Sequence, residues 1–197
     1  MIARIARAEL PSDTVELARW LLGKVLVRRV RSRVRTGRIV ETEAYLTDDP
    51  ACHAFRGETQ RTRSLFKERG HAYVYLCYGT SYLLNMSSEE RGIGAGVLFR
   101  SLQPLEGIEQ MRHGRDHVKL KDIARGPGRL AAAMDVDLKQ DGLDLLTSKE
   151  LWVGRDQHTV ESIGESTRIG LTKAADKRLR FYIAGSAHLS GARTLNA

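Results

Sequence analysis

The chain has 197 residues, of which 42% are hydrophobic and 28% are charged, so it can bury one core and has the balance of an ordinary globular domain. Lysine and arginine outnumber aspartate and glutamate by 32 to 24, and the resulting net charge of +8 attracts polyanions, most commonly nucleic acid. The sequence has neither the ~20 consecutive apolar residues of a membrane span nor a signal peptide, and Cys52 and Cys77 do not suggest a disulfide framework. We therefore expect one cytoplasmic domain over residues 1–197, nucleoid-associated in a bacterium or nuclear in a eukaryote.

The first half of the chain predicts one helix followed by strands. Asp13 and Glu16 have the spacing of a capping box, an apolar stripe follows them, and Gly23 ends the helix. Residues 24–46 alternate and are rich in Val and Arg, which indicates a pair of strands. Residues 73–87 indicate a β-hairpin.

The second half predicts a buried strand at 96–100, a helix from about 104 to 111, a helix beginning at residues 126–128, and a late strand at 179–185. Residues from about 190 to 197 suggest a loose tail. Strands come in runs with helices grouped around them, so the predicted fold class is mixed α+β with a largely antiparallel sheet flanked by helices.

The segment Ile39–Leu46 carries the strongest sign of chemistry. In a strand, Glu41, Glu43 and Tyr45 would point to one face, which places two carboxylates beside an aromatic ring. An enzyme that acts on a nucleic-acid base needs a carboxylate for water and a ring for stacking. A solvated strand face is the commoner explanation of the pattern alone.

The predicted hairpin carries four of the six tyrosines of the chain, at positions 73, 75, 78 and 82. Tyr78 stands near the turn, beside Gly79, Thr80 and Ser81, where an exposed ring suits insertion into a base stack. Ordinary aromatic packing between strands is the alternative explanation.

Several groups of basic residues suit phosphate contacts, each with a structural alternative. One series is either a phosphate-binding segment or a solvated loop: Arg56, Arg61, Arg63, Lys67 and Arg69. Arg129, with Gly128 at a helix start, suits a phosphate site or a plain helix cap.

Other basic residues favour structural roles. Arg100 closes an apolar strand and could form a salt bridge with Glu41. In the densest run, we expect alternation to place Arg29, Arg31, Arg33 and Arg35 on one solvated face, without a dedicated DNA contact.

We expect no metal site. The most suggestive set is Cys52, His53, His71 and Cys77, and its spacing matches no structural zinc pattern.

Taken together, several blocks resemble the alkyladenine (3-methyladenine) DNA glycosylase family. They are GRIVETEAYL, the His53 segment ending in RG, YVYLCYG with Asn85, VLFRSLQPLEG, GPGRL, and RIG with LRFYIAGS. They occur in the expected order and cover nearly the whole chain. The resemblance implies a curved antiparallel sheet in a single α/β domain and an enzyme that uses no metal or organic cofactor.

The resemblance also implies the catalytic roles. Glu43 would be the general base that activates the attacking water. Arg100 and a backbone carbonyl aligned with Ile169 would help to hold that water.

A second set of positions implied by the resemblance binds the base and the duplex. Tyr45, His53 and Tyr75 would enclose the flipped base, and Asn85 would crowd the 2-amino group of guanine. Tyr78 would fill the gap left in the duplex. The remaining DNA contacts would come from Thr80, Arg61, Arg63, Gly128 and Arg129.

The expected activity is hydrolysis of the N-glycosidic bond of a damaged purine in double-stranded DNA, carried out by a monomer. We expect no strand-cleaving lyase step, because no matched site position is a lysine. The lesions are 3-methyladenine, 7-methylguanine, hypoxanthine or ethenoadenine. The chain departs from eukaryotic members between Tyr45 and His53, where it has Asp48, Asp49 and Cys52, and in its smaller residues after Tyr78. A non-catalytic nucleic-acid-binding domain and a Mg²⁺ nuclease using Glu41 and Glu43 are the alternatives.

Overall fold

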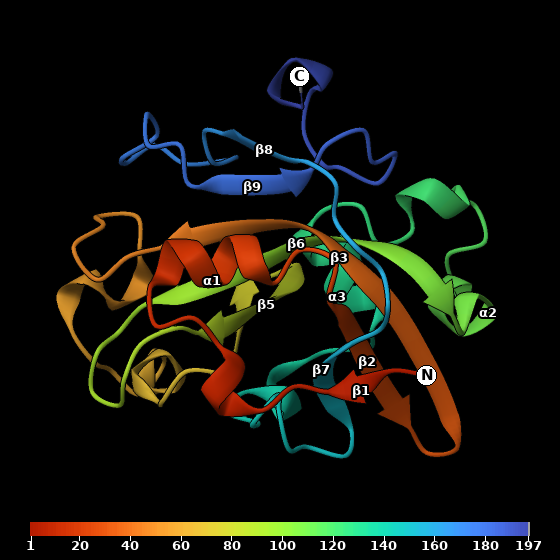
Figure 1. Cartoon of the computed structure of the whole chain (residues 1–197), viewed down its shortest axis with the longest axis horizontal. Coiled ribbons are helices and arrows are strands. Elements are labelled where there is room, and N and C mark those ends of the chain that lie inside the picture. Colours follow the sequence, from red (N-terminus) through yellow and green to blue (C-terminus); the bar gives the residue numbers. More distant parts are fainter. Residues whose placement is uncertain (197) are drawn as a thin grey trace.

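A computed structural model describes residues 1–196 and contains one nine-stranded sheet (Figure 1). Its main path runs β1-β7-β2-β3-β6-β5-β4, while β9 pairs with both β3 and β8, and every pairing is antiparallel. The strands are β1 Ala3–Arg4, β2 Val25–Val30, β3 Arg33–Tyr45, β4 Ala72–Cys77, β5 Ser81–Ser87, β6 Gly96–Glu106, β7 Leu151–Arg155, β8 Ile163–Ser166 and β9 Arg180–Ile183.

Within residues 1–196, three short α-helices and six 3₁₀ turns connect the strands. The α-helices are α1 Thr14–Trp20, α2 Ile108–Arg112 and α3 Pro127–Ala133. The 3₁₀ turns are η1 Arg7–Glu9, η2 His53–Arg56, η3 Arg63–Phe66, η4 Leu120–Asp122, η5 Leu138–Gln140 and η6 Arg193–Leu195. The mixed α+β class and the largely antiparallel sheet predicted from the sequence are confirmed.

The long strand β3 is the centre of the fold and curves across the molecule (Figure 1). Its first part pairs with β2, and its second part lies between β6 and β9. The register with β6 shifts on both sides of Glu41, and such a bulge bends a strand and redirects its side chains. Because residues 41–43 have a strand on each side, Glu41, Thr42 and Glu43 are fully buried.

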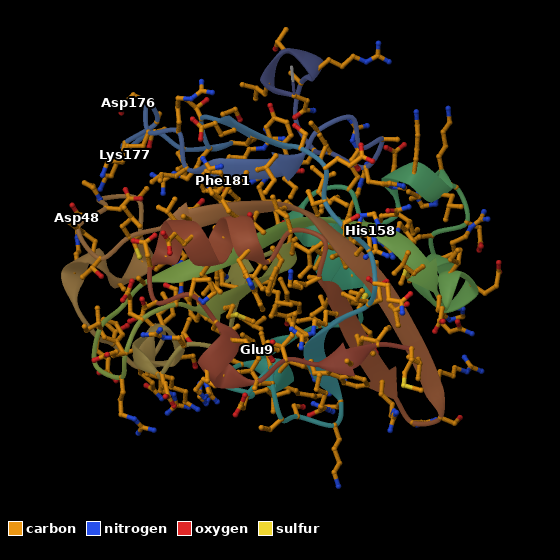
Figure 2. The ribbon with its side chains drawn as sticks, viewed as in Figure 1. Glu9, Asp48, His158, Asp176, Lys177 and Phe181 are labelled. Carbon is orange, nitrogen blue, oxygen red and sulfur yellow. The ribbon has the colours of Figure 1, made fainter. Side chains whose placement is uncertain are left out.

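Helix α1 covers β3, β6 and β9 (Figure 1). The predicted N-cap Asp13 accepts hydrogen bonds from the backbone N–H groups of Val15 and Glu16, both at 2.8 Å, while the return bond from Glu16 that would complete the predicted capping box is absent within residues 1–196. Phe181, which lies on β9 (Figure 2), is buried, and the guanidinium of Arg19 stacks 4.4 Å from its ring. The helix thus fixes β9 against the centre of the sheet.

The expected helix from about residue 104 to 111 is largely wrong. Strand β6 continues to Glu106 because β3 offers it partners as far as Thr36. The chain turns at Gly107, which has φ +71°, and α2 begins only at Ile108. A side chain at position 107 would meet the carbonyl oxygen of Val34 at 2.3 Å, so only glycine allows this close approach.

The predicted common face of alternating arginines is also wrong. Val30 pairs with Arg33 across a two-residue turn, so the alternation changes face there and Arg29 pairs with Val34. Arg29, Arg31 and Arg33 are nevertheless exposed, as expected, whereas Arg35 is partly buried and donates to the carbonyl of Ala133. Two arginines outside the predicted set support the fold: Arg28 binds Glu150, and the buried Arg38 forms two bonds with Asp156.

Strands β1, β7 and β8 were not anticipated from the sequence. Within residues 1–196, no helix has the length and apolar character that a membrane crossing requires.

The Asp13 cap gives a test of this arrangement. Asp13→Ala should lower the free energy of unfolding by about 1 kcal/mol, because two N–H groups lose their acceptor. Urea titration would measure the loss. Asp13→Ser keeps an acceptor at the same place and should cost only a few tenths of that amount, and an equal loss in both variants would contradict the capping role.

Candidate active site

Glu41 lies at the centre of a buried network of hydrogen bonds. Its Oε1 accepts from Arg100 Nε at 2.9 Å, Arg180 Nε at 2.7 Å and Ser190 Oγ at 2.7 Å. Its Oε2 accepts from the backbone N–H of Ser190 at 2.6 Å. Burial acts to raise the pKa of Glu41, but Arg100 and Arg180 outweigh it and hold the pKa below its usual value. Glu41 therefore has the environment of a structural anion.

Glu43 is equally buried but has a different set of donors. Its Oε1 lies 3.2 Å from Arg100 Nη1 and accepts from the backbone N–H of Ile169 at 2.8 Å. Its Oε2 accepts from the hydroxyl of Tyr45 at 2.9 Å. A carboxylate has about four acceptor positions, so these contacts within residues 1–196 leave one position on Oε2.

Arg100 joins the two carboxylates. The expected salt bridge with Glu41 is present, and the same guanidinium also reaches Glu43. Burial acts to lower the pKa of Arg100, but Glu43 and Glu41 raise it above its ordinary value. The shared guanidinium and the hydroxyl of Tyr45 show that Glu41, Glu43 and Tyr45 face the same side, as the alternation of the strand predicts. This side is the protein interior, so a solvated strand face is wrong.

A cavity of about 80 Å³ is lined by Tyr45, whose hydroxyl donates to Glu43. Its lining is mainly aromatic and apolar, with one amide: Tyr45, Ala51, Cys52, His53, Leu65, Tyr73, Tyr75, Asn85, Gly96 and Leu171. Four side chains predicted to bind the base, those of Tyr45, His53, Tyr75 and Asn85, therefore meet in one place. The Asn85 amide donates to the carbonyl of Tyr73 at 3.2 Å, which fixes its orientation.

His53 is held at the wall of this cavity. Its Nδ1 lies 3.0 Å from the hydroxyl of Tyr73, and burial together with Arg61 lowers its pKa, which favours the neutral ring. The centroids of His53 and Tyr75 are 4.5 Å apart. The planes of these rings are inclined by 65°, so His53 and Tyr75, which both line the cavity, pack edge to face.

A wider groove of about 620 Å³ adjoins the cavity, and Tyr45, His53, Tyr75 and Leu171 line both. Its other walls come from the β4–β5 hairpin, the start of α3, and the strand and loop beside Glu43: Arg61, Leu76, Cys77, Tyr78, Thr80, Ser81, Leu83, Leu98, Arg100, Pro127, Gly128, Ile169 and Gly170. The groove thus connects the aromatic cavity to the surface.

Tyr78 projects from the hairpin turn with 93% of its surface exposed. It has φ +49° and the next residue, Gly79, has φ +70°, so two consecutive residues take the left-handed conformation that turns the hairpin. At the opposite wall, a side chain at position 128 would meet Ser81 at 2.9 Å, so Gly128 allows α3 to approach β5 closely.

Three predicted DNA-binding arginines occupy different places. Arg61 lines the groove, and its guanidinium lies 5.6 Å from the centre of the Tyr75 ring. Arg63 is exposed at the start of η3 and lines neither the cavity nor the groove. Arg129 lies beyond the groove in a neighbouring basic hollow with Lys119 and Lys121.

Sequence reasoning missed four buried polar residues of the site, namely Asp49, Arg168, Arg180 and Ser190. The available signal was a basic residue next to apolar positions, in RIG and in LRFYI. From the sequence alone, such a residue is interpreted as a surface cation, because its partner lies far away in the chain. Arg168 pairs with Asp49, and Arg180 pairs with Glu41 across 139 positions.

The segment expected to be a loose tail is hydrogen-bonded in residues 190–196. Arg180 donates to the carbonyl of Ser190, to the carbonyl of Leu195 at 3.0 Å, and to Asn196 Oδ1 at 2.6 Å. The buried carboxylate of Glu41 also binds Ser190. The structure thus differs from the expectation over these residues, and Ala197 lies outside the described part of the chain.

No group of three or more His, Cys, Asp or Glu side chains within residues 1–196 could hold a metal ion. Burial raises the pKa of Cys52 to about 11, which disfavours the thiolate that metals bind. Because Arg100 and Arg180 bind the Glu41 carboxylate, the pair of Glu41 and Glu43 does not have the donor chemistry of a Mg²⁺ nuclease.

A family model described as Methylpurine-DNA glycosylase (MPG) matches residues 8–187. A "Putative 3-methyladenine DNA glycosylase" of Mesorhizobium japonicum is 58% identical over 191 residues, which are 97% of this chain and 92% of that protein. Proteins of the same name from Paraburkholderia phytofirmans and Koribacter versatilis are 47% and 43% identical over 98% of this chain and over 91% and 96% of their own lengths.

The chain belongs to the methylpurine-DNA glycosylase family. It is an enzyme, a DNA glycosylase that hydrolyses the N-glycosyl bond in the repair of alkylated purines. The resemblance noted from the sequence is confirmed, and the family membership favours an enzyme over a non-catalytic nucleic-acid-binding domain.

The Glu41 network predicts a large effect on stability. Glu41→Gln should lower the free energy of unfolding by about 3–5 kcal/mol, because it leaves the buried guanidinium groups of Arg100 and Arg180 without their shared anion. The measurement is urea unfolding at pH 7. Glu150→Gln, at a half-exposed partner of Arg28, is the matched control and should cost less than about 1 kcal/mol.

The same variant tests the pH dependence. The folded-state pKa of Glu41 lies below its ordinary value of 4.5, so its stabilisation is complete above pH 4.5 and is lost as pH falls through the lowered pKa. Glu41→Gln should remove this part of the acid destabilisation. An unchanged acid limb in the variant would contradict the role of Glu41 as a buried anion.

Proposed function

We propose that this glycosylase extrudes a damaged purine from duplex DNA into the aromatic cavity and hydrolyses its glycosidic bond with water activated by Glu43. The observation that carries the proposal is the position of Glu43. Its carboxylate is fixed by Arg100, Tyr45 and the N–H of Ile169, all of which belong to residues that line the groove. One acceptor position on Oε2 is left to take a proton from water.

Extrusion is the first step, because a base in a duplex hides its glycosidic bond. Unstacking costs a few kcal/mol and costs least for damaged or mismatched bases. Tyr78 is exposed beside the groove and suits insertion into the space that the base leaves. Thr80 and Gly128 line the same groove, where backbone phosphate would pass, while the exposed Arg63 and Arg129 would act farther along the duplex.

Base selection would follow in the cavity. Alkylated purines such as 3-methyladenine and 7-methylguanine carry positive charge, which the faces of Tyr45 and Tyr75 attract. A neutral His53 adds no repulsive charge. The fixed amide of Asn85 would crowd the 2-amino group of guanine and so exclude the normal base. Hypoxanthine and ethenoadenine lack this 2-amino group and are further proposed substrates.

In the chemical step, the bond between C1′ and the purine nitrogen breaks and its electron pair leaves with the base. A cationic alkylated purine leaves as a neutral base, whereas hypoxanthine or ethenoadenine leaves as an anion that takes a proton from solvent. The sugar develops oxocarbenium character, and a water oxygen forms the new bond to C1′. Glu43 takes the proton from that water, and its negative charge stabilises the sugar cation. Arg100 and the backbone at Ile169 keep the carboxylate and the water in place. The product is an abasic site, and the proposal requires no lyase step.

Replacing the proposed general base tests this mechanism. Glu43→Gln keeps the shape of the side chain and should slow excision by about 10²–10⁴-fold, because a positioned base contributes on that order, while DNA affinity is retained. Base release from duplexes with one hypoxanthine, ethenoadenine or methylated purine would be measured by alkaline cleavage, with a chelator present. Glu150→Gln is the control, and excision by Glu43→Gln at the wild-type rate would refute the assignment.

The role of Tyr78 can be tested separately. Tyr78→Asn removes the ring and keeps a residue that tolerates the left-handed backbone at this position. We expect unchanged thermal stability and an affinity for lesion-containing duplex at least five-fold weaker, measured by fluorescence anisotropy. Ile163→Asn, on β8 away from the hairpin, is a control for loss of an exposed apolar side chain. Equal affinities of Tyr78→Asn and wild type would contradict a role in duplex binding.

A further inference from the structure

A second buried ion pair, Asp49 with Arg168, lies behind the aromatic cavity. Both side chains have 0% exposure, and Arg168 Nη1 binds Asp49 Oδ2 directly. Asp49 belongs to the loop after β3 and Arg168 to the segment between β8 and β9. Asp48, Asp176 and Lys177 of the same two segments lie at one edge of the molecule (Figure 2). Neither residue lines the cavity or the groove. The pair is therefore too deep to touch DNA directly, and its role must pass through other residues.

Arg168 contacts the strand end that carries Tyr45. Its Nη1 donates to the carbonyl of Ala44 at 2.9 Å, and its guanidinium lies 4.6 Å from the centre of the Tyr45 ring. Tyr45 lines both the cavity and the groove, whereas Arg168 lines neither, so the cation supports the Tyr45 ring from its buried side. The hydroxyl of the same ring donates to Glu43. The ring is thus held at its face by Arg168 and at its edge by the proposed general base.

The backbone next to Arg168 reaches Glu43 directly. Ile169 follows Arg168 in the chain, and its N–H donates to Glu43 Oε1 at 2.8 Å. Arg168 Nη2 also donates to the carbonyl of Ala174 at 3.4 Å, which holds the loop beyond Ile169. The side chain of Arg168 therefore fixes the loop that supplies this N–H.

Asp49 connects the pair to the start of the His53 turn. Its Oδ1 accepts from the N–H of Ala51 at 3.0 Å, and its carbonyl accepts from the N–H of Cys52 at 2.8 Å. His53 follows immediately and begins η2. One ion pair thus joins the segments that position Tyr45, His53 and Ile169, which come from three separate parts of the chain.

We propose that Arg168, anchored by Asp49, is a positioning residue that sets the Tyr45 ring and the Ile169 N–H for recognition of the flipped base. The proposal rests on the function proposed above. A planar guanidinium suits this role because it can stack on the ring and bind an acceptor in the plane at the same time. A lysine at position 168 could keep the charge pair but could not reproduce the stacked plane.

The test uses the double variant Asp49→Asn/Arg168→Gln, which removes both charges together and so avoids a buried, unpaired ion. It is made in the wild-type protein and in the Glu43→Gln protein, which we expect to bind DNA and to excise the base much more slowly. In wild type, we expect at least a ten-fold lower single-turnover rate of hypoxanthine excision. In the Glu43→Gln protein, we expect at least a five-fold loss of the preference for lesion-containing over undamaged duplex. The affinity for undamaged duplex should stay within two-fold.

Two further variants separate positioning from general stability. Arg38→Gln/Asp156→Asn removes another ion pair, which lies outside the site, and should leave the lesion preference unchanged. Arg168→Lys should keep the melting temperature within a few degrees and still lose at least three-fold of the lesion preference. This second variant decides the question if the double variant does not fold.

The outcomes distinguish this proposal from the proposed function. A wild-type lesion preference in the double variant, or in Arg168→Lys, would overturn the positioning role. Failure of the wild-type protein to excise any lesion would count against the proposed function itself. Loss of undamaged-duplex affinity in parallel with lesion affinity would show a general structural defect and would also overturn the proposal.

Discussion

The guanidinium of Arg100 is the interaction on which the rest of the site depends. It lies between Glu41 and Glu43, two carboxylates on one strand that would repel each other in a buried setting. The sheet creates this problem, because β6 and β9 close over both sides of residues 41–43 and remove them from water. The sheet also supplies the solution, because β6 carries Arg100 and β9 carries Arg180. A buried carboxylate such as Glu43 is tolerable only within this set of opposite charges.

The two carboxylates therefore have different tasks although they stand two residues apart. Glu41 is bound by guanidinium groups, by a hydroxyl and by a backbone N–H, and it stabilises the junction of β3, β6, β9 and the segment after β9. Glu43 has fewer donors, and these donors come from Tyr45, Arg100 and Ile169, which line the groove. Because the network binds Glu41 at both oxygens, Arg100 is fixed and can hold Glu43 in place. Glu43 still keeps one free acceptor position on Oε2.

Local patterns in the sequence were sufficient for much of the fold. The cap at Asp13, the start of α3 at Pro127 and the tyrosine-rich hairpin each depend on residues within a few positions of one another. The common face of Glu43 and Tyr45 followed from strand alternation in the same way. Local pattern was not sufficient where long-range pairing decided the outcome. Partners on β3 extend β6 through Pro104, and a two-residue turn reverses the alternation of the arginines. The Asp49–Arg168 pair joins residues 119 positions apart, and no spacing in the sequence indicates such a contact.

The bond between Glu41 and Ser190 has a consequence for how the enzyme comes into being. The two residues are 149 positions apart, so the carboxylate network on β3 is completed by a residue of the segment after β9. During synthesis, β3 leaves the ribosome long before Ser190 does. Until then Glu41 lacks its backbone donor, and the buried charges around Glu43 lack their full support. The nascent protein therefore cannot complete this network until the segment after β9 has been translated and has folded against β3.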